Sequence, residues 1–418
     1  MKLVILGADG YLGWPTAMYM SARGHDVIAV DNGIKRRMEA ELGVEPLVAV
    51  APLAERAKCW NELTRSTIKV VEGDIATDPT LLAAICSKER PEAFVHYAEQ
   101  PSAPYSMRGL DECLLTHHNN VDGTLNLMFA VHDYVPDAHI VKLGTMGEYG
   151  TPNIDIEEGW LNVSHNGRTD RMLYPKKPHS FYHLTKVHDS HNLEFGCRMW
   201  KMRVTDLNQG VVYGFDTEET LLDPILNTSF HYDDVFGTVL NRFVVQALCG
   251  YPLSVYGKGG QTRGYLNIKD TMRCVELALL NPAERGEFRV FNQFTEQFSV
   301  QDLAELVQRA AAMKGLQIYL GYVENPRNEM ENHYYNAVHT GLVDLGLEPH
   351  LLTEEVVGAM LDVASRHRER IRESTIPPRT TWERGAAERL APSLAAEIET
   401  IEARALHGNG VAAPTLRK

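Results

Sequence analysis

The sequence predicts an α/β protein in which a doubly wound parallel sheet is joined to a smaller α/β lobe from the C-terminal half. Three observations predict this fold. Short apolar runs alternate with helical patterns, as βαβ units require. The first run ends in a turn rich in glycine, and later runs also end in polar residues, as strands lining a ligand crevice do. The hydrophobic content of 44% over 418 residues also allows a sizeable core.

The first βαβ unit carries the pattern of a dinucleotide site. Residues 2–6 form an apolar run, as expected of a strand buried on both faces. The turn Gly7-Ala8-Asp9-Gly10-Tyr11-Leu12-Gly13 follows, and a helical pattern then extends to about Arg23. Residues 25–31 form the next strand, which ends in Asp31. This order of strand, glycine turn, helix, strand and acid is typical of a Rossmann unit.

Each glycine of the turn has its own task. Gly7 permits the tight turn, Gly10 lets backbone N–H groups approach a pyrophosphate, and Gly13 allows close packing of helix on strand. Asp31, 18 residues after Gly13, is placed to accept a hydrogen bond from a ribose 2′-OH. A glycine turn without a ligand is the alternative, and the flanking strands and the acid argue against it.

The expected cofactor is NAD. Lys35, Arg36 and Arg37 suggest a 2′-phosphate, but Asp31 would repel one, so NAD is preferred to NADP. The residues expected to line the cofactor site are Gly7, Asp9, Gly10, Tyr11, Leu12, Gly13, Asp31, Asn32, Lys35, Arg36, Asp74, Ile75, Asn119, Tyr182, Lys186 and Val212.

The apolar pattern continues along the chain beyond an unusually long insertion at 33–67. Further strands are predicted at 68–72, 93–97, 140–143 and 202–207, and a helix is predicted over 109–134. The aperiodic segment 151–178 is too long for a simple connection, so it is expected to be a lid or a binding loop.

These elements define three regions. We expect a cofactor domain over 1–215, a substrate lobe over 216–384 that is interleaved with it, and a peripheral helix with a flexible tail over 385–418. Within the lobe, an amphipathic helix is predicted over Glu354–Glu373.

The segment 179–186 carries the predicted proton chemistry. Tyr182 and Lys186 are four residues apart, so on a helix they lie on one face. A lysine beside a tyrosine lowers the pKa of the phenol, which makes it a usable proton acceptor when a sugar hydroxyl is oxidised. The pattern alone is weak, because average composition predicts on the order of one chance match in a chain this long. Thr145, at the end of the predicted strand 140–143, falls at the same crevice.

Charge and composition limit the partners. The net charge of −14 argues against nucleic acid and anionic membranes, so an anionic substrate needs local arginines. The glycine-rich basic loop 256–265 and Arg327 suit a diphosphate clamp, although solvated surface loops would give the same pattern. His183, His188 and His191 lack the spacing of a metal site, and no metal is expected.

The sequence predicts a location in the cytoplasm. Its N-terminus does not match a signal peptide, and no apolar run approaches the ~18 residues of a membrane helix. No Cys-x-x-Cys pair occurs, and the cysteines are expected to be free thiols in a reducing compartment. The six are Cys59, Cys86, Cys113, Cys197, Cys249 and Cys274.

The motifs resemble those of the extended short-chain dehydrogenase/reductases. That family is indicated by Gly-x-x-Gly-x-x-Gly at the first turn, by Thr145, and by Tyr182 with Lys186. Within it, the chain is similar to the UDP-sulfoquinovose synthases over roughly residues 1–350. The matching stretches are 144–159, 186–192, 205–214, 256–265 and 288–300.

This resemblance implies a reaction on a nucleotide sugar. UDP-glucose would be oxidised at carbon 4, lose water across carbons 5 and 6, take up sulfite at carbon 6, and regain hydride at carbon 4. Thr145, Tyr182 and Lys186 carry over to the proton and hydride steps. His183 and Glu148 are the candidates for the carbon-5 and carbon-6 protons. The expected substrate contacts are Gln100, Pro101, Met146, Gln209, Tyr256, Gln261, Arg263, Arg327 and Glu329.

Two departures from related patterns matter. Sugar-nucleotide 4,6-dehydratases place Asp-Glu directly after the threonine, whereas this chain has Met146 and Gly147, so that reaction is disfavoured. The synthase pattern has an arginine where this chain has Pro101, which removes a charged donor. A second hypothesis is therefore a sulfite-independent 5,6-dehydratase that forms an exocyclic alkene on a nucleoside or another hexose-bearing substrate.

A third hypothesis comes from another class, namely an inactive NAD-binding regulator. The intact Thr145, Tyr182 and Lys186 argue against it. A homodimer is possible, since such enzymes often form one, but the sequence does not decide the oligomeric state.

Overall fold

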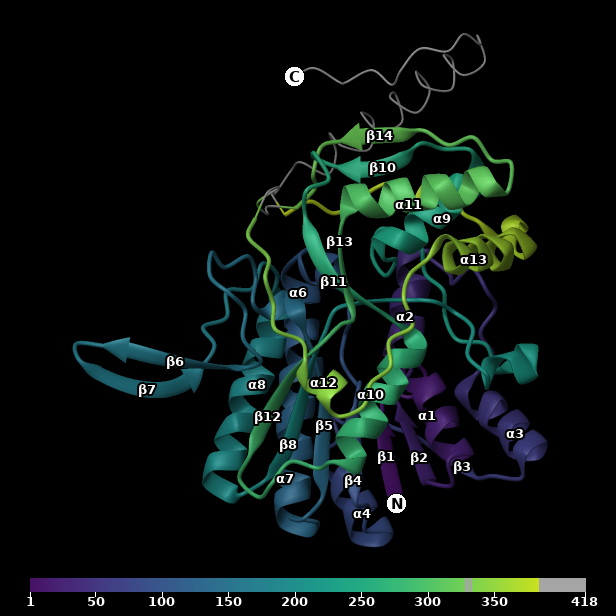
Figure 1. Cartoon of the computed structure of the whole chain (residues 1–418). Coiled ribbons are helices and arrows are strands. Elements are labelled where there is room, and N and C mark those ends of the chain that lie inside the picture. The colour runs from purple at the N-terminus through teal and green to yellow at the C-terminus, as the bar shows by residue number, and fades with distance from the viewer. Residues whose placement is uncertain (328–329, 331–332, 383–418) are drawn as a thin grey trace.

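The computed structural model of the protein describes residues 1–327, 330 and 333–382 (Figure 1). Its centre is a sheet of seven strands in which every neighbouring pair is parallel. In spatial order the strands are β12 (Phe288–Gln293), β8 (Arg203–Gln209), β5 (His139–Thr145), β4 (Ala93–His96), β1 (Lys2–Leu6), β2 (Asp26–Asp31) and β3 (Ile68–Glu72). The strand order reverses between β1 and β4, so the predicted doubly wound sheet is confirmed.

Helices cover both faces of this sheet (Figure 1). Side chains of β1 alternate between the two faces: Leu3 and Ile5 pack into one core cluster, and Val4 and Leu6 into the other. The first face is covered by α1 (Gly13–Ala22), α3 (Leu53–Thr64), α10 (Ile268–Leu280) and α12 (Gly341–Asp344). The second is covered by α4 (Pro79–Glu89), α7 (Gly123–Tyr134) and α8 (Phe181–Trp200).

The substrate lobe lies beyond the carboxyl ends of the central strands, at the top of Figure 1. It has its own apolar core and two small sheets, in the orders β10-β14 and β13-β11-β9. Its strands are β9 (Val211–Tyr213), β10 (Leu253–Tyr256), β11 (Thr262–Asn267), β13 (Glu296–Ser299) and β14 (Leu320–Val323). Its helices are α9 (Val239–Cys249), α11 (Val300–Met313) and α13 (Glu354–Arg366). Between β11 and β13 the chain returns to the central sheet as β12.

Shorter elements complete the fold. The insertion 33–67 contains α2 (Ile34–Leu42) and α3, and two short helices, α5 (Ala103–Ser106) and α6 (Leu110–His117), follow β4. The expected helix over 109–134 is helical throughout, but a π-helical turn, His118–Asp122, separates α6 from α7. The remaining short turns of helix are Met146–Glu148, Thr220–Leu222, Pro224–Leu226, Arg368–Arg370 and Glu373–Thr375.

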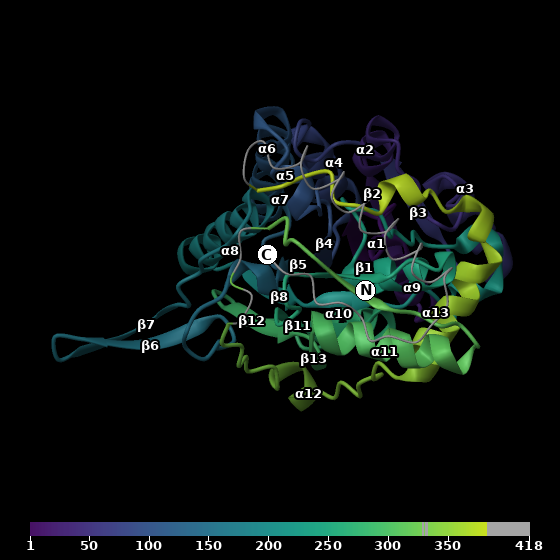
Figure 2. The same ribbon diagram turned by 90° about the horizontal axis from the view of Figure 1, so that it is seen from above.

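Two expectations differ from the structure. The segment 151–178 contains a hairpin, β6 (Trp160–His165) and β7 (Arg168–Leu173), which projects from the body in both views (Figure 2). Its two strands pair antiparallel from Trp160–Leu173 to His165–Arg168, and Trp160 anchors its base by donating to the carbonyl of Phe288 at 3.2 Å. The helix expected to end at Glu373 ends at Arg366, and the chain continues in short 3₁₀ turns. The tail 385–418 lies outside the described residues.

The described residues contain neither a membrane-spanning helix nor a cluster of metal ligands. No helix in that part of the chain is both long and apolar enough to cross a bilayer. No group of three or more His, Cys, Asp or Glu side chains is arranged there to hold a metal ion. The location in the cytoplasm stays a prediction.

Candidate active site

The glycine turn lies where the strand order reverses. Gly7 has a φ of +80°, and a Cβ atom there would collide with the backbone of Tyr97. A Cβ atom at Gly13 would collide with the carbonyl of Gly7. Because only glycine fits at these positions, the turn packs closely against β4 and the start of α1. This cradle fits the pyrophosphate of a dinucleotide.

The substrate lobe holds the other side of the turn. The Tyr11 hydroxyl donates to the carbonyl of Gly214 at 2.6 Å, and Tyr11 and Leu12 pack against Val212 of β9. The turn is thereby fixed to both domains. This places Val212 beside the cradle.

Asp31 and Asp9 organise the ribose end of the crevice. Asp31 accepts hydrogen bonds from the backbone N–H of Asp9 at 2.8 Å and of Gly33 at 2.7 Å. Burial raises the pKa of Asp31, and these two N–H donors counteract part of the rise. The Asp9 carboxylate pairs with Arg36 and with the buried Arg56. Arg36 is therefore committed to the loop and is not directed at a 2′-phosphate, which fits NAD.

Several expected cofactor residues make contacts of another kind. Lys35 pairs with Glu39 and contacts His231 Nε2 at 2.6 Å, so it joins α2 to the substrate lobe. Asp74 accepts from the N–H groups of the two residues after Ile75, and Asn32 caps the start of α2. Asn119 donates to the neighbouring side chain of Asn120 at 3.0 Å. These side chains shape the loops around the crevice.

The Tyr182–Lys186 pair sits on the first turns of α8. Ser180 caps this helix, because its Oγ accepts from the backbone N–H of His183. Lys186 Nζ lies 5.8 Å from the centre of the Tyr182 ring. The same ammonium group donates to the carbonyl of Leu143 at 2.6 Å and pairs with Glu99 at 2.7 Å. Lys186 and Glu99 are both buried.

The pKa of Tyr182 differs from the expectation. Burial raises the pKa of this phenol above its usual value, and the carboxylates of Glu99 and Glu148 raise it further. The predicted lowering by Lys186 does not prevail, because the ammonium group is paired with Glu99. This sequence-based prediction was wrong in sign. The sequence offered no signal that a buried acid would stand behind the lysine.

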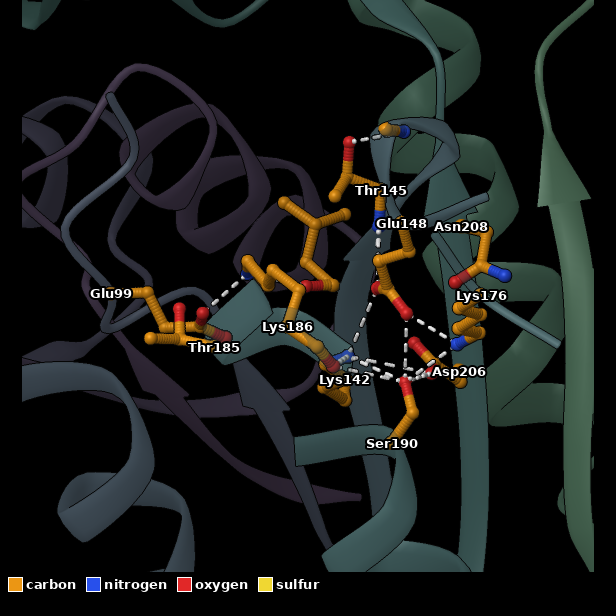
Figure 3. A network of polar contacts seen from close by, with 12 residues as sticks. Glu99, Lys142, Thr145, Glu148, Lys176, Thr185, Lys186, Ser190, Asp206 and Asn208 are labelled. Atoms are coloured by element: carbon orange, nitrogen blue, oxygen red, sulfur yellow. Dashed lines mark hydrogen bonds and ion pairs between the residues drawn. The ribbon is translucent and has the colours of Figure 1, made fainter. Parts of the chain in front are cut away.

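A buried network supports Thr145 (Figure 3). Thr145 caps the turn Met146–Glu148: its Oγ accepts from the N–H of Gly147, and its own N–H donates to Glu148 at 3.1 Å. Glu148 is fully buried and pairs with Lys142 and with Lys176. The network also contains Ser190 and Asp206.

Glu148 is therefore poorly suited to exchange protons with a substrate. Burial alone would raise the pKa of its carboxyl group, but Lys142 and Lys176 lower it to about 2. The carboxylate stays ionised and holds the backbone of Thr145. In the structure Glu148 positions the backbone of Thr145, and its expected part in proton transfer stays a prediction.

His183 fills the space beside the Thr145 turn. A side chain at Gly147 would collide with the His183 ring, so the glycine makes room for the imidazole. His183 Nδ1 lies 2.9 Å from Ser180 Oγ. Burial lowers the pKa of His183 to about 3, helped by the cations Arg327 and Arg263. The imidazole is neutral at physiological pH.

A cavity of about 270 Å³ opens between α8, α5 and the substrate lobe. Of the expected substrate contacts, it is lined by Pro101, Tyr256, Gln261, Arg263 and Arg327, together with Tyr182 and His183. The segment 151–178 contributes no residue to the lining of this cavity. The expected lid is therefore not found over it.

Three expected substrate contacts do not line this cavity. The Gln100 side chain donates to Ser102 and Thr116, and the Gln209 side chain donates to Gln293. Met146 is buried in an apolar cluster. Glu329 lies outside the described residues.

Sequence reasoning missed most of the other lining residues, among them Arg242 and Trp382. Arg242 lies within an apolar helical pattern, and Trp382 lies in a segment without any pattern. Neither residue could therefore be recognised from the sequence as part of the substrate site.

A dinucleotide crevice that leads to a Tyr–Lys pair on one helix face is the arrangement of the short-chain dehydrogenase/reductases. The expected class of enzyme is thus supported by the geometry of the site. A family model described as the NAD dependent epimerase/dehydratase family matches residues 3–292. The chain belongs to this family, which is the extended branch of the short-chain dehydrogenase/reductases, and it is an enzyme that uses NAD.

Curated relatives and solved structures agree with this assignment. The chain is 52% identical over 383 residues to the chloroplastic UDP-sulfoquinovose synthase of Spinacia oleracea, covering 92% of this chain and 79% of the plant protein. It is 42% identical over 385 residues to the UDP-sulfoquinovose synthase of Sulfolobus acidocaldarius, covering 91% of this chain and 98% of the other.

A solved structure is similar in fold. The UDP-glucose 4-epimerase of Bifidobacterium longum, in complex with NAD⁺ and UDP, superimposes with a TM-score of 0.66 at 16% identity. The match covers 89% of this chain and 100% of that one.

Proposed function

We propose that the protein is a UDP-sulfoquinovose synthase, which converts UDP-glucose and sulfite into UDP-sulfoquinovose and water. The observation that carries this proposal is one cavity that joins Tyr182 and His183 to Arg263 and Arg327. Titratable side chains at one part of the cavity and arginines at another suit a sugar linked to a diphosphate. The two relatives above, both named UDP-sulfoquinovose synthase, support it.

The cavity is positive where a diphosphate would lie. Two carboxylates also line it: Asp234 pairs with Arg379 at 2.8 Å, and Asp233 hydrogen-bonds with His231 at 2.9 Å. The three arginines of the lining, Arg242, Arg263 and Arg327, outnumber these acids. Arginine is well suited to bind phosphate oxygens, because its guanidinium group presents several N–H donors in one plane.

The atoms balance over four steps. The carbon-4 hydroxyl is oxidised to a ketone, which acidifies the hydrogen on carbon 5. That proton and the carbon-6 hydroxyl leave as water, giving an alkene conjugated to the ketone. The sulfite sulfur bonds to carbon 6 while carbon 5 regains a proton, and the ketone is reduced. NAD, when bound, accepts and later returns the carbon-4 hydride.

The chain's own residues move the protons. Tyr182, once its own phenol has ionised, takes the proton of the carbon-4 hydroxyl and gives it back at the end. Lys186, fixed by Glu99 and by the Leu143 carbonyl, holds a positive charge behind the phenol. Thr145, held by Glu148, orients the hydroxyl.

His183 is the titratable group proposed for the carbon-5 proton. A base must be neutral before it can accept a proton, and burial with Arg327 and Arg263 keeps His183 neutral. An anionic diphosphate on these arginines would cancel part of their effect and raise the pKa of His183. Substrate binding would thus strengthen the base only when the base is needed.

The sulfite-independent dehydratase is not favoured. That alternative depended on Pro101, which lines the cavity as a residue without charge. Relatives at 52% and 42% identity over more than nine-tenths of the chain are UDP-sulfoquinovose synthases. In this protein the attraction of sulfite would come from Arg263 and Arg327.

Product mass tests the proposal. The enzyme is incubated with UDP-glucose and NAD, with and without sulfite, and the nucleotide sugars are weighed by mass spectrometry. A sulfite-dependent gain in mass that is absent in Tyr182→Phe is expected. An unsaturated sugar formed without any response to sulfite would contradict the synthase assignment. No turnover of UDP-glucose would contradict the substrate.

A homodimer is also proposed, and it rests on one face of α7 and α8. Phe129, Phe195 and Met199 are 52%, 46% and 54% exposed there. Exposed apolar residues gathered on neighbouring helices are typical of an interface. Gel filtration of the wild type and of Phe195→Ser would test it, and two identical monomeric profiles would contradict it.

A further inference from the structure

The last described segment of the chain, residues 377–382, lies across one side of the substrate cavity. In Figure 2 the yellow segment that follows α13 runs beside α2 towards α5. Pro378, Thr380 and Trp382 line the cavity. We call residues 377–382 the strap.

Both ends of the strap are anchored. Arg379 donates to Asp234 through its backbone N–H at 2.7 Å and through Nε at 2.9 Å, and Nη1 donates to the carbonyl of Leu42 at 3.2 Å. At the other end, the N–H of Trp382 donates to the carbonyl of Pro326 at 3.1 Å. The strap is thereby attached to Asp234 and α2 at one end. At the other end it is attached to the loop that carries Arg327.

Two side chains of the strap have properties that indicate a ligand. Thr380 Oγ is buried inside the cavity lining and has no hydrogen-bond partner among the residues that the structure describes. A buried hydroxyl without a hydrogen-bond partner destabilises the protein unless a ligand or a water molecule forms a hydrogen bond with it. The indole of Trp382 is half-buried, and the Arg327 guanidinium lies 5.9 Å from the ring centre.

The order of the groups in a nucleotide sugar indicates which part of the substrate lies against the strap. The proposed function places the hexose at Tyr182 and the diphosphate at Arg263 and Arg327. The nucleoside follows the diphosphate, so it falls beyond the arginines. Trp382 adjoins Arg327 there. An aromatic ring beside a phosphate-binding arginine is suited to stack on a nucleobase.

We propose that the strap forms the nucleoside wall of the substrate site, with the base packing on Trp382 and Thr380 Oγ supplying a hydrogen bond to the nucleoside. This inference rests on the proposed function and extends it, because it assigns nucleotide recognition to a segment beyond the matched family region 3–292. Arg379 acts as a positioning residue, since it holds the strap on Asp234.

The test compares two ligands that differ only in the nucleoside. Calorimetry measures the affinity of the full-length enzyme for UDP and for inorganic pyrophosphate. Trp382→Ala is expected to weaken UDP binding about ten-fold, as loss of one base stack does, and to leave pyrophosphate binding nearly unchanged. Trp382→Phe should restore most of the affinity for UDP. Thr380→Val should weaken UDP binding by a smaller factor.

Trp200→Ala, which changes a tryptophan at the end of α8, is the matched control and should bind both ligands as the wild type does. Equal losses for UDP and pyrophosphate in Trp382→Ala would overturn the inference, because the strap would then act only through Arg327. Unchanged UDP binding in Trp382→Ala would overturn it as well. A wild type that binds pyrophosphate but gains nothing from the nucleoside would overturn both the inference and the proposed function.

Discussion

The Glu99 carboxylate lies 2.7 Å from Nζ of Lys186, and the two side chains are each 2% exposed. This buried ion pair stands directly behind the Tyr182 phenol. The lysine therefore does not act as a lone positive charge, and its effect on the tyrosine depends on the acid. Burial and Glu99 together keep the proton on the phenol more firmly than in free tyrosine.

Glu99→Gln tests this relationship through pH dependence. The change removes a negative charge near Tyr182 but keeps the shape and an acceptor for Lys186. Because burial and then Glu99 raise the pKa of the phenol, loss of the charge should lower it. The acid limb of kcat/KM, which reports deprotonation of Tyr182, should move to lower pH.

The other charges facing this site are Lys142, Glu148 and Asp189, and all of them stay in place in Glu99→Gln. Glu99→Asp keeps the charge, so its acid limb should remain near that of the wild type. A pH profile that is the same in Glu99→Gln and wild type would show that the pair is only structural.

Glu148→Gln tests the buried network through stability. Removing this charge leaves Lys142 and Lys176 without part of their compensation. Breaking a buried pair from one side typically costs about 3–5 kcal/mol of the free energy of unfolding. Denaturant titration at neutral pH should therefore give a lower midpoint for the variant.

The sign of the pH dependence provides a second check. Lys142 and Lys176 overcome the effect of burial and lower the pKa of Glu148 to about 2, against 4.5 in the unfolded chain. The stabilisation is thus complete above pH 4.5 and is lost as pH falls towards 2. The stability difference between wild type and Glu148→Gln should shrink over that interval. A difference independent of pH would point to packing and not to charge.

Much of the cofactor half could be predicted, because its signals are local. The turn Gly7–Gly13 and Asp31 lie within one βαβ unit, where spacing along the chain fixes spacing in space. Tyr182 and Lys186 are likewise one helical turn apart. Local backbone geometry determines where these residues lie, so the sequence pattern was enough to predict their positions.

The parts that were missed depend on long-range packing. Glu99 meets Lys186, and Glu148 meets Lys176, across segments that the sequence does not bring together. Burial and these acids reverse the expected pKa shift of Tyr182, and the neighbouring lysines keep Glu148 ionised. Trp382 lines the cavity in a strap held by Arg379 on Asp234 and by its own N–H on the Pro326 carbonyl. No periodicity or motif marks such contacts.

His183→Asn separates the oxidation from the elimination. Tyr182, Lys186 and Thr145 remain, so oxidation at carbon 4 should persist. The carbon-5 proton loses its base, and overall turnover should fall about 100-fold, as expected for loss of a general base. Absorbance of reduced nicotinamide should therefore accumulate with UDP-glucose while product formation nearly stops. Equal losses of both signals would indicate that His183 only supports the fold of the Thr145 turn.

Pro101→Arg tests how the cavity attracts sulfite. Pro101 lines the cavity together with Tyr182 and His183, and proline offers neither a charge nor an N–H donor. A guanidinium group there would add a charged hydrogen bond, which is typically worth about 1.5–3 kcal/mol. The KM for sulfite should fall about ten-fold or more, with a smaller change in kcat.

Pro101→Ala is the control for the loss of the ring. It relaxes the backbone but adds no charge, so its KM for sulfite should stay near that of the wild type. If Pro101→Arg leaves the KM for sulfite unchanged, the anion approaches from the side of Arg263 and Arg327, away from residue 101. If both variants lose activity equally, the rigid proline itself positions the segment that follows β4, and charge at this site is unimportant.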